Sequence, residues 1–404
     1  MLTLCAALLI APRLLAQSAE PARSNFKVVY SFTGTKDGGL PETQLVLDKF
    51  GNAYGSTAAG GNPGCLYDLG CGTVFKVSPT GKETVLHRFT GGTDGAGPYY
   101  TAMIRDAEGN LYGNTFYGGN PTCNYEGAVG CGVIFKLDRH GRYTVLHSFT
   151  GGKDGADPEA GMVLDSVGNL YGTTYLGGSG SCNGSGCGVV FKLDRNGHET
   201  VLYRFTGSTD GAFPADTTLI RDSAGNIFGT TYGPVNSNYG TVFKLDTTGR
   251  ETTLHAFSGG ADGRYPTGLI RDVSGKLYGT TLEGGRFGYG TVFVLDQTGR
   301  ETVLYSFHGK GDGFYPLGDL VQDQVGNLYG VTRYGGDLPC NTVGCGTVFK
   351  ISRNLGVTVL HKFVKSDGVG PVVGLMPDKK GHLWGVANNG GTAGGGGTVF
   401  EVTY

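Results

Sequence analysis

The sequence predicts an all-β protein, a seven-bladed β-propeller with four antiparallel strands in each blade. The chain of 404 residues contains 76 glycines beside 22 tyrosines and 21 phenylalanines, a composition typical of short aromatic strands joined by tight turns. A G-[TV]-[VI]-F motif recurs seven times, and each copy lies within a repeat that holds four strand-like segments. Repeats of this kind are typical of propeller blades.

The fourth repeat shows the four predicted strands most clearly. They are strand A at 219–222, strand B at 227–231, strand C at 240–246 and strand D at 252–257. The A–B connection reads Asp-x-x-Gly in all seven repeats, from Asp48 and Gly51 to Asp378 and Gly381. Aspartate at the first position and glycine at the fourth are typical of a type I turn. Strands A and B should therefore pair antiparallel, and similar C–D turns predict the same for strands C and D.

The two ends of the repeat region predict how the ring closes. Residues 28–32 read as a strand D without the other three strands, and residues 399–402 read as a strand C without a strand D. Each fragment supplies what the other lacks. We therefore expect one domain over residues 25–404, in which the N-terminal strand completes the last blade.

Residues 1–19 are interpreted as a secretory signal peptide. An apolar run from Leu2 to Ala16 precedes small and polar residues, as expected before a cleavage site. No second apolar run of about 20 residues occurs, so we expect no membrane span. The net charge of −2 provides no basic surface for nucleic acid. We expect a monomeric protein that is secreted or periplasmic.

Eight cysteines follow the signal segment, and they occur as close pairs within single B–C loops. The pairs are Cys65 with Cys71, Cys123 with Cys131, Cys182 with Cys187 and Cys340 with Cys345. Their spacings differ from those of zinc ribbons. Blades contain both cysteines or neither, and Tyr239 and Tyr289 stand at the second position in two blades without them. Export and this pattern predict four disulfides, each within one loop.

The repeat unit resembles a known family. The pattern S-F-[TS]-G-G-x-D-G-x-x-P, followed by D-x-x-G-N-L-Y-G-T-T and G-T-V-F-K-L-D, is similar to the GloVer tandem repeat of secreted or surface-attached bacterial proteins. The resemblance covers essentially the whole mature chain. It implies a repeat architecture and export, and it implies no particular reaction.

The B–C and D–A loops vary between blades, whereas the Asp-x-x-Gly turns do not. Because variable loops on a rigid scaffold commonly carry binding sites, we expect any ligand on the B–C/D–A face. The candidate residues there are Asp68, Glu126, Glu283, Arg286, Arg333, Asp337 and Asn388. The G-x-D-G loops carry further aspartates, which either close their own loops or contribute to a calcium site: Asp94, Asp154, Asp210, Asp262 and Asp312.

No motif identifies a reaction. The sequence lacks a G-x-S-x-G elbow, a G-x-x-x-x-G-K-[ST] loop and an H-E-x-x-H pair, so serine-hydrolase, nucleotide and zinc-protease chemistry lose support. No catalytic residue is assigned, and calcium is the only cofactor considered. We interpret the chain as an exported non-enzymatic binding or structural module for an extracellular glycan or protein. The alternative is a propeller hydrolase or lyase that acts on extracellular polysaccharide through loop acids.

Overall fold

The A–B turns explain how each hairpin begins. In the computed structural model, which describes residues 26–65, 68–125, 128–178, 182–215, 218–233, 239–309, 311–336, 340 and 342–404, the Gly51 N–H donates to the Asp48 carbonyl at 3.0 Å. The Asp48 carboxylate also accepts the N–H groups of Phe50 and Asn52, both at 2.9 Å. The aspartate thus satisfies backbone donors that the turn would leave unpaired.

Seven sheets result, and each forms one blade. Blade 1 contains β4 (Val46–Leu47), β5 (Ala53–Ala59), β6 (Thr73–Val77) and β7 (Glu83–Arg88), with β2 (Gly39–Pro41) also paired to β5. Blade 2 contains β9 (Ile104–Arg105), β10 (Leu111–Thr115), β13 (Val133–Leu137) and β14 (Tyr143–Ser148). Blade 3 contains β15 (Val163–Leu164), β16 (Leu170–Thr174), β17 (Val189–Leu193) and β18 (Glu199–Arg204). Blade 4 contains β19 (Ile220–Arg221), β20 (Ile227–Thr231), β21 (Thr241–Leu245) and β22 (Glu251–Ala256).

The remaining blades follow the same order. Blade 5 contains β23 (Arg264–Arg271), β24 (Leu277–Glu283), β25 (Thr291–Leu295) and β26 (Glu301–Ser306). Blade 6 contains β27 (Phe314–Gln322), β28 (Leu328–Tyr334), β29 (Thr347–Ile351) and β30 (Val357–Lys362). Blade 7 contains β31 (Met376–Pro377), β32 (His382–Ala387), β33 (Thr398–Thr403) and β1 (Phe26–Ser31). Outside the blades lie β3 (Thr43–Gln44) paired with β8 (Thr101–Ala102), β11 (Asn124–Tyr125) paired with β12 (Ala128–Val129), and the 3-10 turn η1 (Cys182–Gly184).

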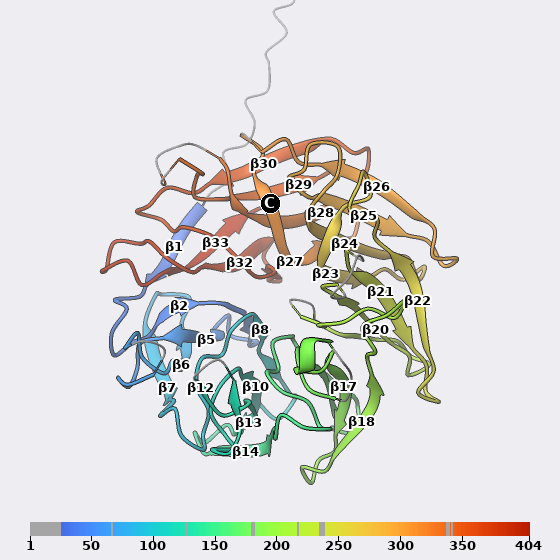
Figure 1. Ribbon diagram of the computed structural model, residues 1–404. Helices are drawn as coiled ribbons and strands as arrows, with labels where there is room; N and C mark the ends of the chain where they lie inside the picture. The colour runs from blue at the N-terminus through green and yellow to red at the C-terminus, as the bar shows by residue number, and fades with distance from the viewer. Residues whose placement is uncertain are drawn as a thin grey trace, which may run out of the picture.

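The predicted fold class is confirmed: the chain is a seven-bladed β-propeller. Figure 1 shows the blades arranged around a central axis, with the blue strand β1 beside the red strands β33 and β32. The predicted closure is also confirmed, because β1 pairs antiparallel with β33 and aligns Val28 with Phe400. No helix in the described residues is long and apolar enough to cross a membrane.

The hydrophobic core lies between adjacent blades. In every blade a phenylalanine of strand D meets the strand C phenylalanine of the next blade edge to face, with ring centroids 5.0–5.5 Å apart. Phe32 and Phe75 form one such pair across the ring closure. Trp384 is only 3% exposed and belongs to the core. Each blade is therefore stabilised by both neighbours.

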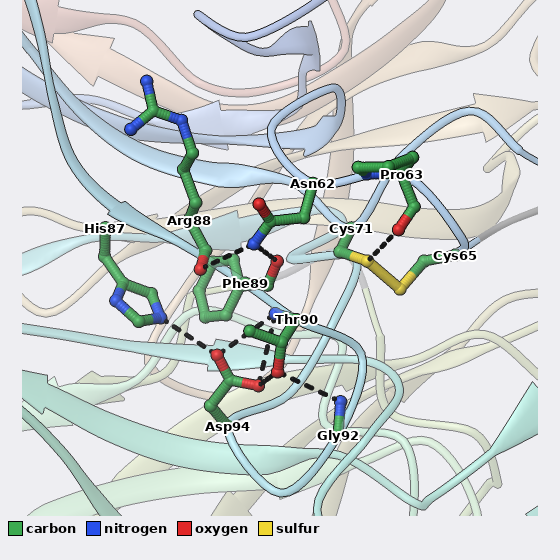
Figure 2. The surroundings of a disulfide bond; sticks show 10 residues. All are labelled: Asn62, Pro63, Cys65, Cys71, His87, Arg88, Phe89, Thr90, Gly92 and Asp94. Atoms are coloured by element: carbon green, nitrogen blue, oxygen red, sulfur yellow. Dashed lines mark hydrogen bonds and ion pairs between the residues drawn. A yellow bond between two sulfur atoms is a disulfide. The ribbon is translucent and has the colours of Figure 1, made fainter.

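All four predicted disulfides form within single loops. Figure 2 shows the Cys65–Cys71 bond beside Phe89 and Asn62, whose side-chain amide donates to the Phe89 carbonyl at 2.8 Å. In blades 4 and 5, which have no cysteines, Tyr239 and Tyr289 fill the same place. A Cβ on Gly207 would meet Cys182 Sγ at 2.6 Å, and a Cβ on Gly259 would meet the Tyr239 ring at 2.5 Å. Disulfide and tyrosine therefore support equivalent turns.

Candidate functional site

A small cavity lies on the axis of the ring. Its volume is about 20 Å³, and its lining comes from six blades: Gln44, Tyr100, Thr101, Gly161, Thr218, Gly318, Asp319, Val372, Val373 and Gly374. Gly318 and Asp319 lie within β27, and Gln44, Gly161, Thr218 and Gly374 stand at the positions equivalent to Asp319 in their blades, four residues before the turn aspartate. A space of this size can hold one water molecule beside polar groups.

Asp319 is the carboxyl group of this cavity. It stands four residues before the turn aspartate of blade 6, where the other blades have Gln44, Ala102, Gly161, Thr218, Gly268 and Gly374. Its side chain is buried, and Oδ1 accepts the Leu269 N–H at 3.2 Å. Burial raises the pKa of Asp319 to about 6, although hydrogen bonds from Thr218 and Leu269 act in the opposite direction. A carboxyl with this pKa can exchange a proton near neutral pH.

Glu42 stands between β2 and β3, beside blade 7. It is 5% exposed, and its Oε1 accepts the side-chain amide of Asn388 from blade 7 at 3.0 Å. The Asn389 amide in turn donates to Asn388 Oδ1 at 2.9 Å. Burial, the Glu42 charge and Tyr117 together raise the pKa of Tyr99 in blade 2. Glu42 therefore acts electrostatically on residues from both adjoining blades.

Glu283 is held in an ion pair on the opposite side of the ring. Strands β23 and β24 align it with Arg264, whose Nε donates to Glu283 Oε2 at 2.9 Å. The Arg264 guanidinium lies 5.5 Å from the ring of Tyr265. Tyr265 stacks on Tyr232, with centroids 4.5 Å apart and planes inclined by 8°. The B–C/D–A face thus combines charged groups with flat aromatic surfaces.

The remaining sequence-predicted candidates do not gather around these groups. Asp68 is exposed in its loop. The Arg286 guanidinium lies 5.4 Å from the Phe287 ring, and that of Arg333 lies 5.3 Å from the Tyr334 ring. Glu126 and Asp337 lie outside the described residues. Among the candidates that are described, only Asn388 and Glu283 have a polar side-chain contact to another residue of this face.

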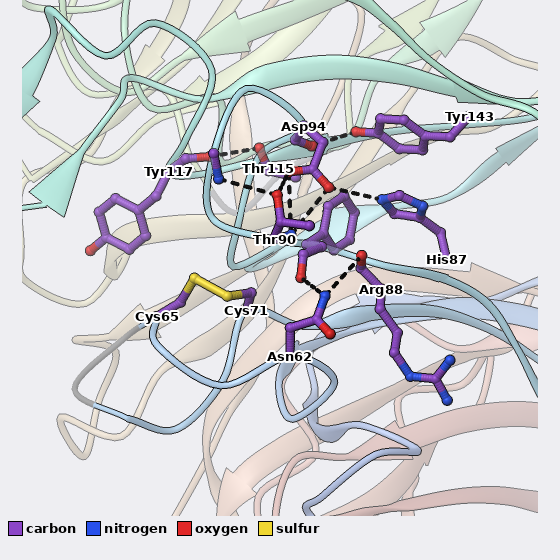
Figure 3. A network of polar contacts seen from close by, with 12 residues as sticks. Asn62, Cys65, Cys71, His87, Arg88, Thr90, Asp94, Thr115, Tyr117 and Tyr143 are labelled. Carbon is purple, nitrogen blue, oxygen red and sulfur yellow. Dashed lines mark hydrogen bonds and ion pairs between the residues drawn. A yellow bond between two sulfur atoms is a disulfide. The ribbon is translucent and has the colours of Figure 1, made fainter.

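The G-x-D-G aspartates close their own loops. Asp94 Oδ2 accepts the Thr90 N–H at 3.1 Å and lies 3.2 Å from His87 Nε2 (Figure 3). Burial favours a higher pKa for Asp94, but hydrogen bonds from His87 and Thr90 outweigh burial and lower the pKa. In the described part of the chain, no three Asp, Glu, His or Cys side chains are placed to hold a metal ion. The calcium expectation stays a prediction.

A protein-family model provides the family of the chain. The Gloeobacter/Verrucomicrobia repeat model matches residues 121–344 and 260–404, which together are more than half of the sequence. The chain belongs to the Gloeobacter/Verrucomicrobia repeat family. This assignment confirms the resemblance seen in the repeat pattern. A search of curated proteins found no match.

Solved structures show that this family member shares its fold with other propellers. The extracellular domain of a proposed one-component system from B. thetaiotaomicron has a TM-score of 0.54 at 15% identity, covering 92% of this chain and 40% of that one. A proposed 6-phosphogluconolactonase from Bacteroides uniformis has a TM-score of 0.50 at 16% identity, with 78% and 84% covered. A gluconolactonase from Xanthomonas campestris has a TM-score of 0.42 at 13% identity, with 74% and 82% covered.

The expectation of a non-enzymatic binding or structural module is wrong. The comparisons favour the alternative of a propeller enzyme, because similar propellers include proteins named as enzymes, such as the one from Bacteroides uniformis. The B–C loops, where the sequence placed its candidates, do not contain these groups, because Asp319 lies within the innermost strand β27 and Glu42 lies between β2 and β3. A detectable sign was present at position 319, which carries the only acid among seven equivalent positions.

Proposed function

We propose that the chain is a propeller hydrolase that cleaves an extracellular polysaccharide at the B–C/D–A mouth of its central channel. The observation that carries this proposal is Asp319, a buried carboxyl whose pKa is raised to about 6 beside an axial cavity of about 20 Å³. A water molecule in that cavity would lie next to a base suited to neutral pH. The four disulfides are consistent with secretion or a periplasmic location.

The reaction requires two carboxyl groups with different tasks. Ionised Asp319 takes a proton from the water, and the water oxygen attacks the anomeric carbon of the sugar. The glycosidic carbon–oxygen bond breaks, and the leaving oxygen receives a proton from Glu42 in its protonated form, which Asn388 holds in place. This division between base and acid is that of an inverting glycosidase. The stacked rings of Tyr232 and Tyr265 offer an aromatic surface to neighbouring sugar units.

A sugar lactone is the second candidate substrate. It is favoured by the similarity to the proposed 6-phosphogluconolactonase, whose TM-score is 0.50. The same Asp319 base would direct water onto the lactone carbonyl, and the ring oxygen would leave. Polysaccharides and sugar lactones should therefore be assayed together, by release of reducing ends and by release of acid.

Asp319→Asn is the decisive variant. The amide can still accept the Leu269 N–H, so the fold should persist, whereas turnover should fall by about 100-fold or more. Wild-type kcat/KM should rise with pH through about 6, because the base must be ionised. Glu108→Gln, which alters an exposed carboxyl in the Asp-x-x-Gly turn of blade 2, serves as the matched control and should retain turnover. Full activity of a folded Asp319→Asn variant, or no wild-type activity on either substrate class, would refute the proposal.

A further inference from the structure

A second and much larger cavity opens at the other end of the propeller, among the Asp-x-x-Gly turns of blades 2 and 3. Its volume is about 970 Å³, and it reaches the axis at Gln44 and Thr218. Pockets for small molecules commonly have volumes of this order. We call this cavity the turn-side groove. Gln44 and Thr218 line both this groove and the axial cavity, so the two spaces adjoin at the axis. The groove itself extends outward among the turns, and the ligand proposed for it is independent of the hydrolase proposal.

Three of the other six gaps between blades place an arginine here, whereas the remaining three have Leu47, Gln322 and Pro377 at the corresponding position. Arginines that precede the turn aspartate of one blade reach back over the strand B aromatic of the preceding blade. The guanidinium carbon lies 5.7 Å from the ring for Arg105 on Tyr54, 5.2 Å for Arg221 on Tyr171 and 5.5 Å for Arg271 on Phe228. Such cation–π contacts stabilise the positive charge at the ring face.

Phe228 demonstrates that one ring can serve two cations. Lys244 of its own blade lies 6.0 Å from the ring, in addition to Arg271 of the next blade. Arg271 also lowers the pKa of Asp222, the turn aspartate of blade 4, although burial and hydrogen bonds from Asn226 are larger influences. An aromatic ring and a turn carboxylate therefore form the ordinary environment of the arginine.

The gap between blades 2 and 3 retains this environment but lacks the arginine. Tyr112 has Lys136 of its own blade 5.5 Å from its ring, and its hydroxyl donates to Asp106 at 3.1 Å. The residue that corresponds to the arginine is Leu164, which packs in the same cluster as Tyr112 without supplying a charge. Glu108 adds a second turn carboxylate, and its equivalents in other blades are not acidic. The groove has four carboxylates against three cations: Asp106, Glu108, Asp165 and Asp194 against Arg105, Lys136 and Arg195.

The inner wall of the groove is adapted for an apolar group. The chain contains four methionines, and three of them, Met103, Met162 and Met376, line this one groove. Met103 and Met162 stand where the other five blades have leucine. Met103 and Met162 are only 5% and 2% exposed, so a ligand would reach them by rearrangement of these flexible, polarisable side chains.

We propose that the turn-side groove binds a free aliphatic cation. Its guanidinium or primary ammonium head lies over Tyr112 beside Asp106 and Glu108, in the place that arginine occupies in other gaps. Its uncharged carbon chain lies along the methionines. The geometry of the arginine sites and the concentration of methionines support this assignment through independent observations.

Butylguanidinium is a suitable probe, and butylurea is its neutral counterpart of nearly equal shape. The protein carrying ¹³C-methyl methionine would be titrated with each compound. Butylguanidinium should shift the resonances of Met103, Met162 and Met376 in a saturable manner, while butylurea should bind at least about tenfold more weakly. Absence of saturable shifts with butylguanidinium, or equal affinity for butylurea, would overturn the proposal.

Two variants test the site within the same experiment. Leu164→Arg supplies an internal guanidinium to Tyr112 and should abolish binding of the probe. Glu108→Gln, an exposed change that leaves the fold intact, should weaken binding by about threefold. Glu283→Gln on the opposite face is the matched control and should bind as the wild type does. Unchanged affinity in Glu108→Gln would contradict the proposal even if Leu164→Arg failed to fold.

Discussion

At the scale of single residues, one glycine of each blade is required by its contact with the next blade. Gly188 has a φ of +88°, and an added Cβ would lie 2.3 Å from the Thr174 carbonyl oxygen and 2.6 Å from Pro214 Cδ. Pro214 belongs to the loop that enters blade 4. The same contact recurs with Gly240 and Pro266. A backbone carbonyl and a proline ring cannot move aside as a flexible side chain would. Glycine is therefore needed here because the neighbouring blade is too close for a Cβ, as well as because φ is positive.

Comparison of two alanine variants would separate these requirements. Gly141 has a similar φ of +86°, but an added Cβ would have no atom within 4 Å. Gly141→Ala should therefore lose about 1 kcal/mol of unfolding free energy from backbone strain alone. Gly188→Ala should lose about 1–3 kcal/mol more through overpacking. Urea denaturation measures both values, and equal losses would argue against the inter-blade role of Gly188.

At the scale of strands and loops, irregular pairing brings adjoining blades together. Strand D carries a register shift opposite strand C in every blade, for example between Val190 and Phe191 of strand C in blade 3. The bulged residue of blade 2 is Leu146, and its carbonyl oxygen would lie 2.8 Å from a Cβ on Gly197 in the next blade. Bulges redirect side chains, and here they also allow close contact between neighbouring blades.

The cysteine loops provide a prediction at the same scale. Cys182→Ser combined with Cys187→Ser should lower the unfolding free energy by about 2 kcal/mol, because the unfolded chain loses a constraint. Cys182→Ser combined with Cys187→Tyr should recover part of this loss. The reason is that Tyr239 fills the equivalent place against Gly259. Thermal and urea unfolding would decide the matter, and a serine variant as stable as the wild type would contradict it.

At the scale of the whole molecule, carboxyl pairs lie between successive blades near the outer edge of the ring. A glutamate at the start of strand D lies close to the aspartate of the G-x-D-G loop that follows the preceding blade, and burial together with the negative charge of this aspartate raises the pKa of the glutamate. Burial first and Asp37 second raise the pKa of Glu83 to about 7, and burial with Asp262 does the same for Glu301. Glu251 shows the same direction through burial and Asp210. The folded ring therefore holds these protons more tightly than the unfolded chain.

The contribution of these glutamates to the free energy of unfolding should fall as pH rises from 4.5 through about 7. Because the folded-state pKa of Glu301 is raised from 4.5 to about 7, its favourable contribution is complete below pH 4.5 and is lost as pH rises through about 7. Glu301→Gln should be more stable than the wild type at pH 8 and nearly equal at pH 4. Melting temperatures across this range provide the measurement, with Glu108→Gln as the exposed control. If the melting temperature of the wild type changed between pH 4 and pH 8 as much as that of Glu301→Gln, and in the same direction, the assignment would be refuted.

The sequence by itself determined the blades, their number, the ring closure and the four disulfides. These features depend on local turn chemistry, on repetition and on cysteines close together in the chain, so no knowledge of distant contacts was needed. Only the tertiary structure placed Asp319 in an axial cavity and paired Glu42 with Asn388, which are 346 positions apart. It likewise paired Glu283 with Arg264 and opened the turn-side groove beside Leu164. Burial, pKa and cavity shape arise where several blades meet, and a repeat pattern read blade by blade does not contain that information.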